Sequence, residues 1–266
     1  MMLKKWSRGR AAIAAAVLLG LGFAGSASTG AASLVPLRNA TATYTQPNPS
    51  VPGLWSPAKT IDGRISGQFT SWATVNRNVG PGGDVNRSEA IVWETVSNLS
   101  LDGREPIQFS LHFKDSVPVG NRGLGRFKIS YTTDPRRTFA NGLDIGGDVM
   151  ANWMTIDLIG LRSDSGEAFD TLADGSILVA AGTGTKPSYY ATALLSVANI
   201  TGFRLDALEH SSLPFGGPGA GGVGGAPVDL QNFHLSEFQV EVVPLPASLP
   251  LLAAGVGALA WLGRAA

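Results

Sequence analysis

Apolar side chains recur at every second position in many short segments of this chain. Ile107, Phe109, Leu111 and Phe113 alternate with other residues, and 127–131 repeats the pattern. Successive side chains of a β-strand point to opposite faces, so this period predicts strands with one buried face. Helical periodicity is weak outside the two ends of the chain.

Glycine and proline separate these segments. The 266 residues include 34 glycines and 16 prolines, which interrupt helices and supply tight turns. Many short strands between such turns predict an all-β fold, an antiparallel β-sandwich or jelly roll. The chain has no cysteine, so we expect a substantial hydrophobic core rather than disulfides to stabilise it.

Charge is sparse and balanced. Lysine and arginine number 20 against 20 aspartates and glutamates, and all four together make up 15% of the chain. Nucleic-acid binding depends on a strong positive field. We therefore expect no nucleic-acid partner.

The N-terminus has the pattern of an export signal. Four of the first ten residues are lysine or arginine, an apolar run follows over 11–24, and small residues continue to Ala32. This order predicts a signal peptide over 1–32, removed by signal peptidase. The alternative is a retained N-terminal membrane anchor, although the run is shorter than the roughly 20 residues of a typical span.

The C-terminal segment 243–266 also has an apolar stretch, which is preceded by a proline-containing joint. The joint consists of Val243, Pro244, Leu245, Pro246 and Ala247. Residues 248–262 carry no charge, and Arg264 is the one basic residue after them. Two prolines prevent a strand or helix from continuing through the joint, so we expect it to be extended.

This order of joint, apolar helix and basic residue resembles the PEP-CTERM sorting signals of bacteria, in particular the VPLPA-CTERM variant. The resemblance implies an exported protein, held briefly in the inner membrane until a membrane exosortase cuts the tail. The product would then reach the cell surface or extracellular matrix. The family usually ends in several arginines, whereas Arg264 stands alone here. An uncut C-terminal anchor is the alternative.

The β-rich region between the ends covers 38–242. Its start, with Ala58, an Asp62-Gly63 turn and Trp72, resembles the galactose-binding-like (discoidin-like) β-sandwiches. The region is expected to be one continuous unit, or else two lobes over 38–140 and 148–242.

Catalytic motifs are missing from the sequence. The three histidines, His112, His210 and His234, lie far apart, and no metalloprotease or nucleophile-elbow motif occurs. We therefore expect no enzyme, and a secreted hydrolase with an unrecognised site is the least favoured alternative.

The galactose-binding-like resemblance implies a structural Ca²⁺ site. An aspartate near the Asp-Gly turn and a glutamate on the last strand approach each other in such folds, and Asp62 and Glu237 are the matching positions. Calcium takes six to eight oxygen ligands. The alternative is that Asp62 only forms the turn.

Sandwiches of this kind commonly bind sugars through aromatic side chains. Trp55 and Tyr189, with the neighbouring Tyr190, are the candidates, because they lie in or beside loops and are expected to be exposed. Trp72 and Trp93 fall within alternating strands and are expected in the core. The favoured function is an adhesive or carbohydrate-binding surface protein whose partner is an extracellular polysaccharide. A structural envelope protein that binds no ligand is the alternative.

The joint yields the first testable prediction. Replacing Pro244 and Pro246 by alanine should let helix extend into the joint, because proline costs about 3 kcal/mol inside a helix. Unprocessed precursor should then accumulate in the membrane fraction, as measured by immunoblot. Processing at the parental rate would contradict a recognition role for the joint.

Overall fold

The computed structural model describes residues 31–48, 50–75, 87–116, 123–180, 186–221 and 231–244. The predicted signal peptide, apart from its last two residues, and the tail beyond Pro244 lie outside these ranges. No helix in the described ranges is both long enough and apolar enough to span a membrane.

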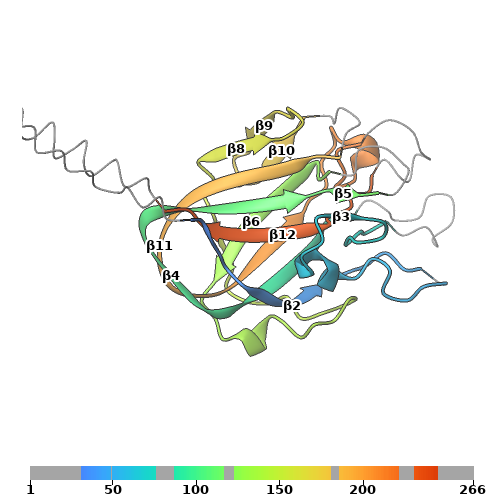
Figure 1. Cartoon of the computed structure of the whole chain (residues 1–266). Coiled ribbons are helices and arrows are strands. Elements are labelled where there is room, and N and C mark those ends of the chain that lie inside the picture. The colour runs from blue at the N-terminus through green and yellow to red at the C-terminus, as the bar shows by residue number, and fades with distance from the viewer. Residues whose placement is uncertain are drawn as a thin grey trace, which may run out of the picture.

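The all-β prediction is confirmed (Figure 1). The strands of the described ranges are β1 (Ser33–Leu34), β2 (Leu37–Ala42), β3 (Ser66–Gly67), β4 (Glu89–His112), β5 (Lys114–Asp115), β6 (Arg126–Thr132), β7 (Met154–Thr155), β8 (Gly160–Ser163), β9 (Phe169–Thr171), β10 (Ile177–Val179), β11 (Ser188–Ala207) and β12 (Glu237–Val242). Three short 3₁₀ helices accompany them, at Pro57–Ile61, Arg136–Thr138 and Pro214–Gly216.

Two long antiparallel strands, β4 and β11, run side by side through a sharp bend (Figure 1). Their pairing extends from Ser188 opposite His112 to Ala207 opposite Glu89. Strand β4 has 24 residues and β11 has 20, and the excess is taken up by register shifts between Leu194 and Gly202. Such bulges bend a strand locally, so the pair contributes to two layers.

The first layer contains the C-terminal half of β4 and the N-terminal half of β11. Strand β12 pairs with this half of β4, β1 pairs with β12, and β8 pairs with β11. The second layer contains the other halves, flanked by β2 and β6, with β7 and the β9–β10 pair beyond β6. Strands from 38–140 and 148–242 therefore share one ten-stranded sheet.

Aromatic rings fill the space between the layers. Trp93 of the second layer stacks on Phe238 of the first, with ring centroids 4.0 Å apart and planes inclined by 7°. Phe109 meets Phe203 edge to face at 5.5 Å. Trp72 and Trp93 have no exposed surface, which confirms their predicted core positions. Trp93 lies in β4 as expected, whereas Trp72 forms an isolated bridge with Leu235 outside the strands.

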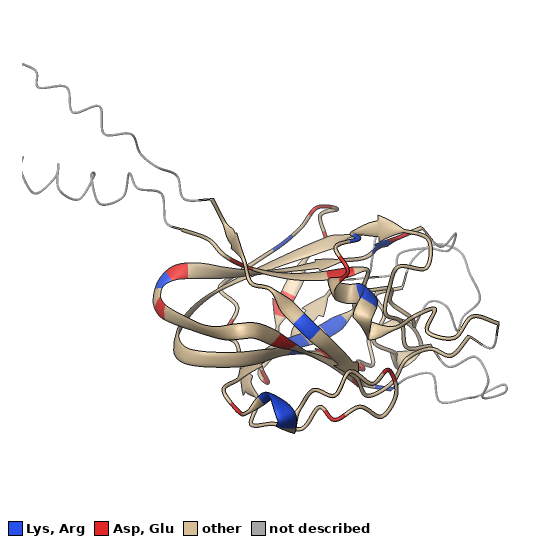
Figure 2. Cartoon of the chain, turned by 60° about the horizontal axis from the view of Figure 1, so that its bottom comes forward, with Lys and Arg blue, Asp and Glu red and all other residues tan. Residues whose placement is uncertain are grey.

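The outer faces of the two layers differ. The second layer is covered by 133–153, because Phe139, Val149 and Trp153 pack with Val92 of β4 into a small separate core. The first layer presents mainly polar side chains on its outer face. Lysine and arginine are interspersed with aspartate and glutamate over the ribbon (Figure 2).

Gly202 provides a test of the packing beside the bend. A Cβ atom there would lie 2.5 Å from a Phe139 ring carbon and 2.7 Å from the Trp93 carbonyl oxygen. Gly202→Ala should therefore lower the free energy of unfolding by about 1–3 kcal/mol, as overpacking does. Gly160→Ala is the control, because its Cβ would meet Thr192 at an ordinary 3.5 Å. Equal denaturation midpoints for the two variants would contradict this account.

Candidate functional site

The outer side of the first layer is a mainly polar sheet face, and we call it the β12–β8 face. Residues 107, 109 and 111 of β4 point into the core, so the even-numbered residues and their register partners point outward. The face is formed by Gln108, Ser110, Arg162, Tyr190, Thr192, Gln239 and Glu241. Arg162 is exposed, Ser110 is buried, and the others are half-buried.

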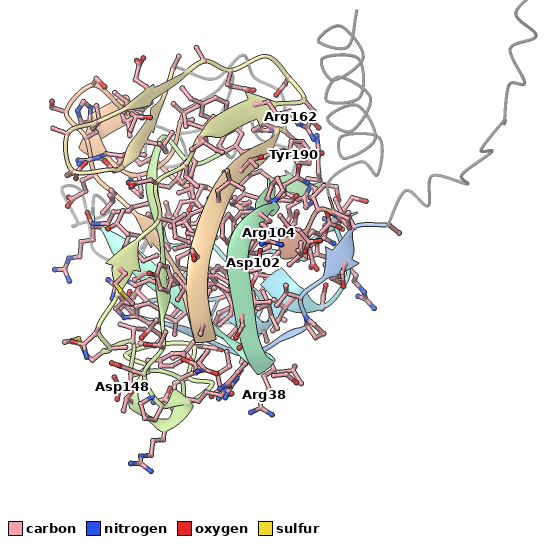
Figure 3. The ribbon with its side chains drawn as sticks, turned by 90° about the vertical axis from the view of Figure 1, so that its left-hand side faces the viewer. Arg38, Asp102, Arg104, Asp148, Arg162 and Tyr190 are labelled. Atoms are coloured by element: carbon pink, nitrogen blue, oxygen red, sulfur yellow. The ribbon has the colours of Figure 1, made fainter. Side chains whose placement is uncertain are left out.

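Arg162 and Tyr190 are register partners on β8 and β11, and they lie side by side on this face (Figure 3). The guanidinium carbon of Arg162 lies 3.6 Å from the centroid of the Tyr190 ring, a cation–π contact. His112 approaches the same ring edge-on at 6.0 Å. The arginine head is thus positioned by an aromatic side chain.

A buried row adjoins the face on the same side of the sheet. Glu237, His112 and Ser188 are register partners on β12, β4 and β11, and Ser188 Oγ lies 2.9 Å from His112 Nδ1. Burial lowers the pKa of His112. The residue types are those of a hydrolase triad, but Ser188 is only 1% exposed, so its hydroxyl is closed to substrate. Sequence spacing gave no sign of this row, because its members come from three distant segments.

A second buried group joins serine, histidine and aspartate near the β3–β5 pair. The Asp115 carboxylate accepts hydrogen bonds from the Phe69 and Thr70 N–H groups, at 3.1 and 3.0 Å, and from Ser71 Oγ at 2.6 Å. His234 Nδ1 lies 3.4 Å from the same Ser71 hydroxyl. Phe69 has a positive φ of 59°, and these bonds hold the turn that contains it. We assign the group a structural role.

The structure brings the turn at Asp62 and Gly63 to Glu237, the pair proposed as calcium ligands. The Gly63 N–H donates to Glu237 Oε2 at 3.2 Å. Burial raises the pKa of Glu237 to about 7, and the Asp62 charge contributes to that shift. A hollow of about 200 Å³ adjoins Glu237 and is lined mainly by apolar residues such as Ile61 and Phe238.

These two carboxylates supply only part of the oxygen ligands that calcium requires. Within the described ranges, no group of three or more histidine, aspartate or glutamate residues is placed to hold a metal ion. Asp62 Oδ1 already accepts a hydrogen bond from the Arg64 N–H at 2.9 Å. An ion at this position would need backbone oxygens in addition, so calcium binding stays a prediction.

Two aromatic residues proposed to contact a ligand are buried, which corrects the expectation that they are exposed. Trp55 is 5% exposed and packs edge-on against His234 and Phe69. Tyr189 is fully buried, and its hydroxyl donates to the Leu124 carbonyl at 3.1 Å. Adjacent residues of a strand face opposite ways, so Tyr190 alone of the tyrosine pair reaches the outer face.

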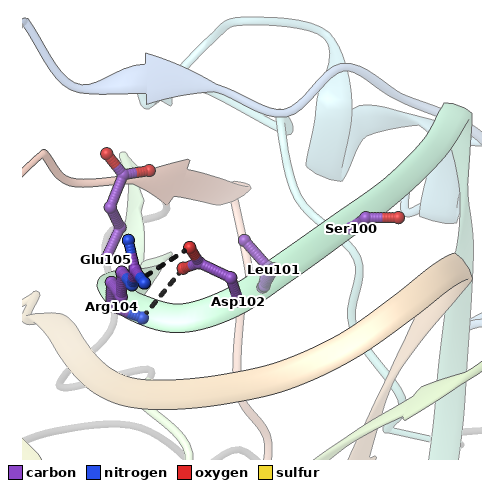
Figure 4. A pocket seen from close by; sticks show the side chains of 5 residues that line it. All are labelled: Ser100, Leu101, Asp102, Arg104 and Glu105. Atoms are coloured by element: carbon purple, nitrogen blue, oxygen red, sulfur yellow. Dashed lines mark hydrogen bonds and ion pairs between the residues drawn. The ribbon is translucent and has the colours of Figure 1, made fainter.

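A hollow of about 540 Å³ lies at the bend of β4 (Figure 4). Two of its charged residues pair with each other, because Arg104 Nε lies 3.6 Å from Asp102 Oδ2 and the Arg104 backbone N–H donates to Asp102 Oδ1 at 3.0 Å. Ser100, Leu101 and Glu105 complete the lining. The Asp102–Arg104 contacts stabilise the turn.

The predicted sorting joint begins where the sheet ends. The Val243 N–H donates to the Pro106 carbonyl at 2.8 Å, and Pro244 follows at the limit of the described residues. Leu245, Pro246, Ala247 and Arg264 lie outside them. Strand β1 pairs with β12, with Ser33 opposite Val242, so both described ends of the domain lie side by side.

Comparisons with known proteins give little guidance. No protein-family model matches the chain, and no curated protein matches it. A solved structure of the Streptococcus pneumoniae beta-galactosidase BgaA is similar over 78% of this chain and 97% of that chain, with 13% identity and a TM-score of 0.45. A likeness at this level carries no argument about function.

The raised pKa of Glu237 predicts how the stability of the fold depends on pH. A pKa raised from 4.5 to about 7 means that the folded state keeps a proton that the unfolded state loses between these values. This stabilisation is complete below pH 4.5 and is lost as pH rises through 7. Glu237→Gln should therefore raise the melting temperature relative to the parent increasingly between pH 5 and pH 8, measured in EDTA.

Glu241→Gln, on the same strand, controls for the loss of one charge. A pH-independent difference between Glu237→Gln and the parent would contradict the assigned role of Glu237. Repeating the melts with CaCl₂ in place of EDTA tests the ion: calcium bound by Asp62 and Glu237 would raise the parental midpoint and leave that of Glu237→Gln unchanged.

Proposed function

We propose that this chain is an exported carbohydrate-binding protein of the cell surface or extracellular matrix, and that the β12–β8 face is its binding surface. Sugars are recognised by polar side chains that bond hydroxyl groups, often together with aromatic residues. The face offers amides, hydroxyls and a carboxylate from strands in register, with Tyr190 and Arg162 at its β8 side. This row of partly exposed polar side chains on one side of the sheet is the observation that carries the proposal.

The contrast between the two layers supports this assignment. Residues 133–153 cover the second layer with a hydrophobic patch, so that surface is used for folding. Over the β12–β8 face, Gln108, Thr192 and Gln239 are half-buried and keep part of their surface exposed. Polar side chains at such positions are available to a ligand that lies flat on the sheet.

Export and sorting form the second part of the proposal. They rest on the basic and apolar pattern of 1–32 and on the resemblance of 243–266 to the VPLPA-CTERM signal. Signal peptidase and a membrane exosortase are the processing partners that this resemblance implies. The side-by-side position of Ser33 and Val242 is compatible with processing at both ends, because each cut would lie beyond the edge of the sheet.

Binding can be tested with the full chain in detergent on an array of neutral and acidic polysaccharides. Tyr190→Ala should weaken binding at least tenfold, whereas Tyr190→Phe keeps the ring and should bind like the parent. Arg137→Ala, in the 3₁₀ helix over the opposite layer, is the control. Parental binding by Tyr190→Ala would exclude this face as the site.

The same samples separate the alternatives. A structural envelope protein would bind none of the glycans, in parent and variants alike. A hydrolase would release reducing ends from a bound polysaccharide over time, whereas a binding protein would leave the polysaccharide length unchanged. Fractionation of cells and medium tests export independently of binding.

A further inference from the structure

Three exposed arginines of the described chain have no carboxylate partner: Arg64, Arg137 and Arg162. Other arginine heads are occupied. Arg126 pairs with Asp174 at 2.7 Å, and Arg204 pairs with Asp206 at 2.6 Å. An unpaired surface arginine is ordinary, so position and surroundings must distinguish one that binds a ligand.

Arg162 differs from the other two because its head group is held in place. Its guanidinium carbon lies 3.6 Å from the centroid of the Tyr190 ring, whereas Arg64 and Arg137 make no such ring contact with the described residues. An arginine head held over an aromatic face keeps its N–H donors at its edge, where they can bond a carboxylate in bidentate fashion. Less side-chain entropy is lost on binding when the head is already positioned.

The same contact limits what Tyr190 can do. Because Arg162 lies directly over the ring, that ring face is closed to a stacked sugar while the arginine stays in place. Recognition at this point must therefore use the donors of Arg162. A group with two acceptor oxygens in one plane fits them best.

Neighbouring charges leave Arg162 available. Asp164, two residues along the chain, is engaged by the Lys114 ammonium at 2.6 Å. Glu241 lies on β12, which is separated from β8 by both β4 and β11. In the row that contains Arg162, the register partners across the sheet are Tyr190, Ser110 and Gln239, and none of them is an acidic or a basic residue.

We propose that Arg162, held on Tyr190, binds the carboxylate of an acidic sugar, so that the β12–β8 face selects uronate-containing polysaccharides. This rests on the proposed carbohydrate-binding function and names its substrate class. Gln239, in the same row, and Gln108 and Thr192, in the next, would bond the hydroxyl groups of sugars along the chain. Arg162 would provide the selectivity for acidic sugars, and the other residues of the face would extend the contact along the polysaccharide.

The test compares one polymer with and without its charge. Oligogalacturonate and its carboxyl-reduced product are titrated into the full chain by calorimetry, in detergent and at low salt. The parent should bind oligogalacturonate at least tenfold more tightly than the reduced product, and added salt should weaken the binding. Arg162→Ala should lose at least tenfold, and Arg162→Lys should fall between because a lysine lacks the planar fork.

Arg64→Ala and Arg137→Ala are matched controls, since each removes an unpaired surface arginine without a ring beneath it. Thermal melts of every variant establish that it is folded. Equal binding of the two oligosaccharides, or an unchanged affinity in Arg162→Ala, would overturn the acidic-sugar proposal while leaving carbohydrate binding intact. Binding of neutral array glycans without any binding of oligogalacturonate would do the same. Absence of binding to every glycan would overturn both proposals.

Discussion

The hydrogen-bonded pairing of β4 with β11 determines how the rest of this fold is arranged. Each strand is long enough to belong to both layers. At the bend, backbone N–H and C=O groups that bonded neither the partner strand nor water would be left unsatisfied. Register shifts near Leu194 and Ile200 let β4 follow a longer path around the turn. Every other strand of the ten-stranded sheet is attached to one half of this pair, directly or through a neighbour.

The bend also decides which side chains become available to a ligand. Alternation sends Phe109 and Trp93 inward from opposite layers, where they pack around Phe238 and Phe203. It sends the intervening residues outward. The two outer faces differ because 133–153 packs over the second layer and not over the first. The candidate site is therefore the polar side of a core strand pair, held rigid by the core beneath it.

Sequence periodicity predicted the strands and the core because both depend on local alternation, as over 107–113. It could not predict that Trp55 would be buried, since the residue that packs against it, His234, lies far away in the chain. The galactose-binding-like resemblance brought Asp62 and Glu237 to attention, and the Gly63 to Glu237 hydrogen bond shows that these segments meet. The sequence did not indicate Arg162 as a site residue, because its head group is positioned by a tyrosine ring on another strand.

Strand β12 links the candidate face to the end of the described chain. It carries Gln239 and Glu241, pairs with β4 along its length, and leads directly into Val243 and Pro244. A pull on the C-terminal segment would act along β12, so its ladder bonds to β4 would be loaded in shear and would have to break together. A protein tethered through this end while its first layer holds a polysaccharide would transmit the load through the sheet itself, without passing it through a loop. The antiparallel pairing of β1 with β12 extends the same ladder on the other side.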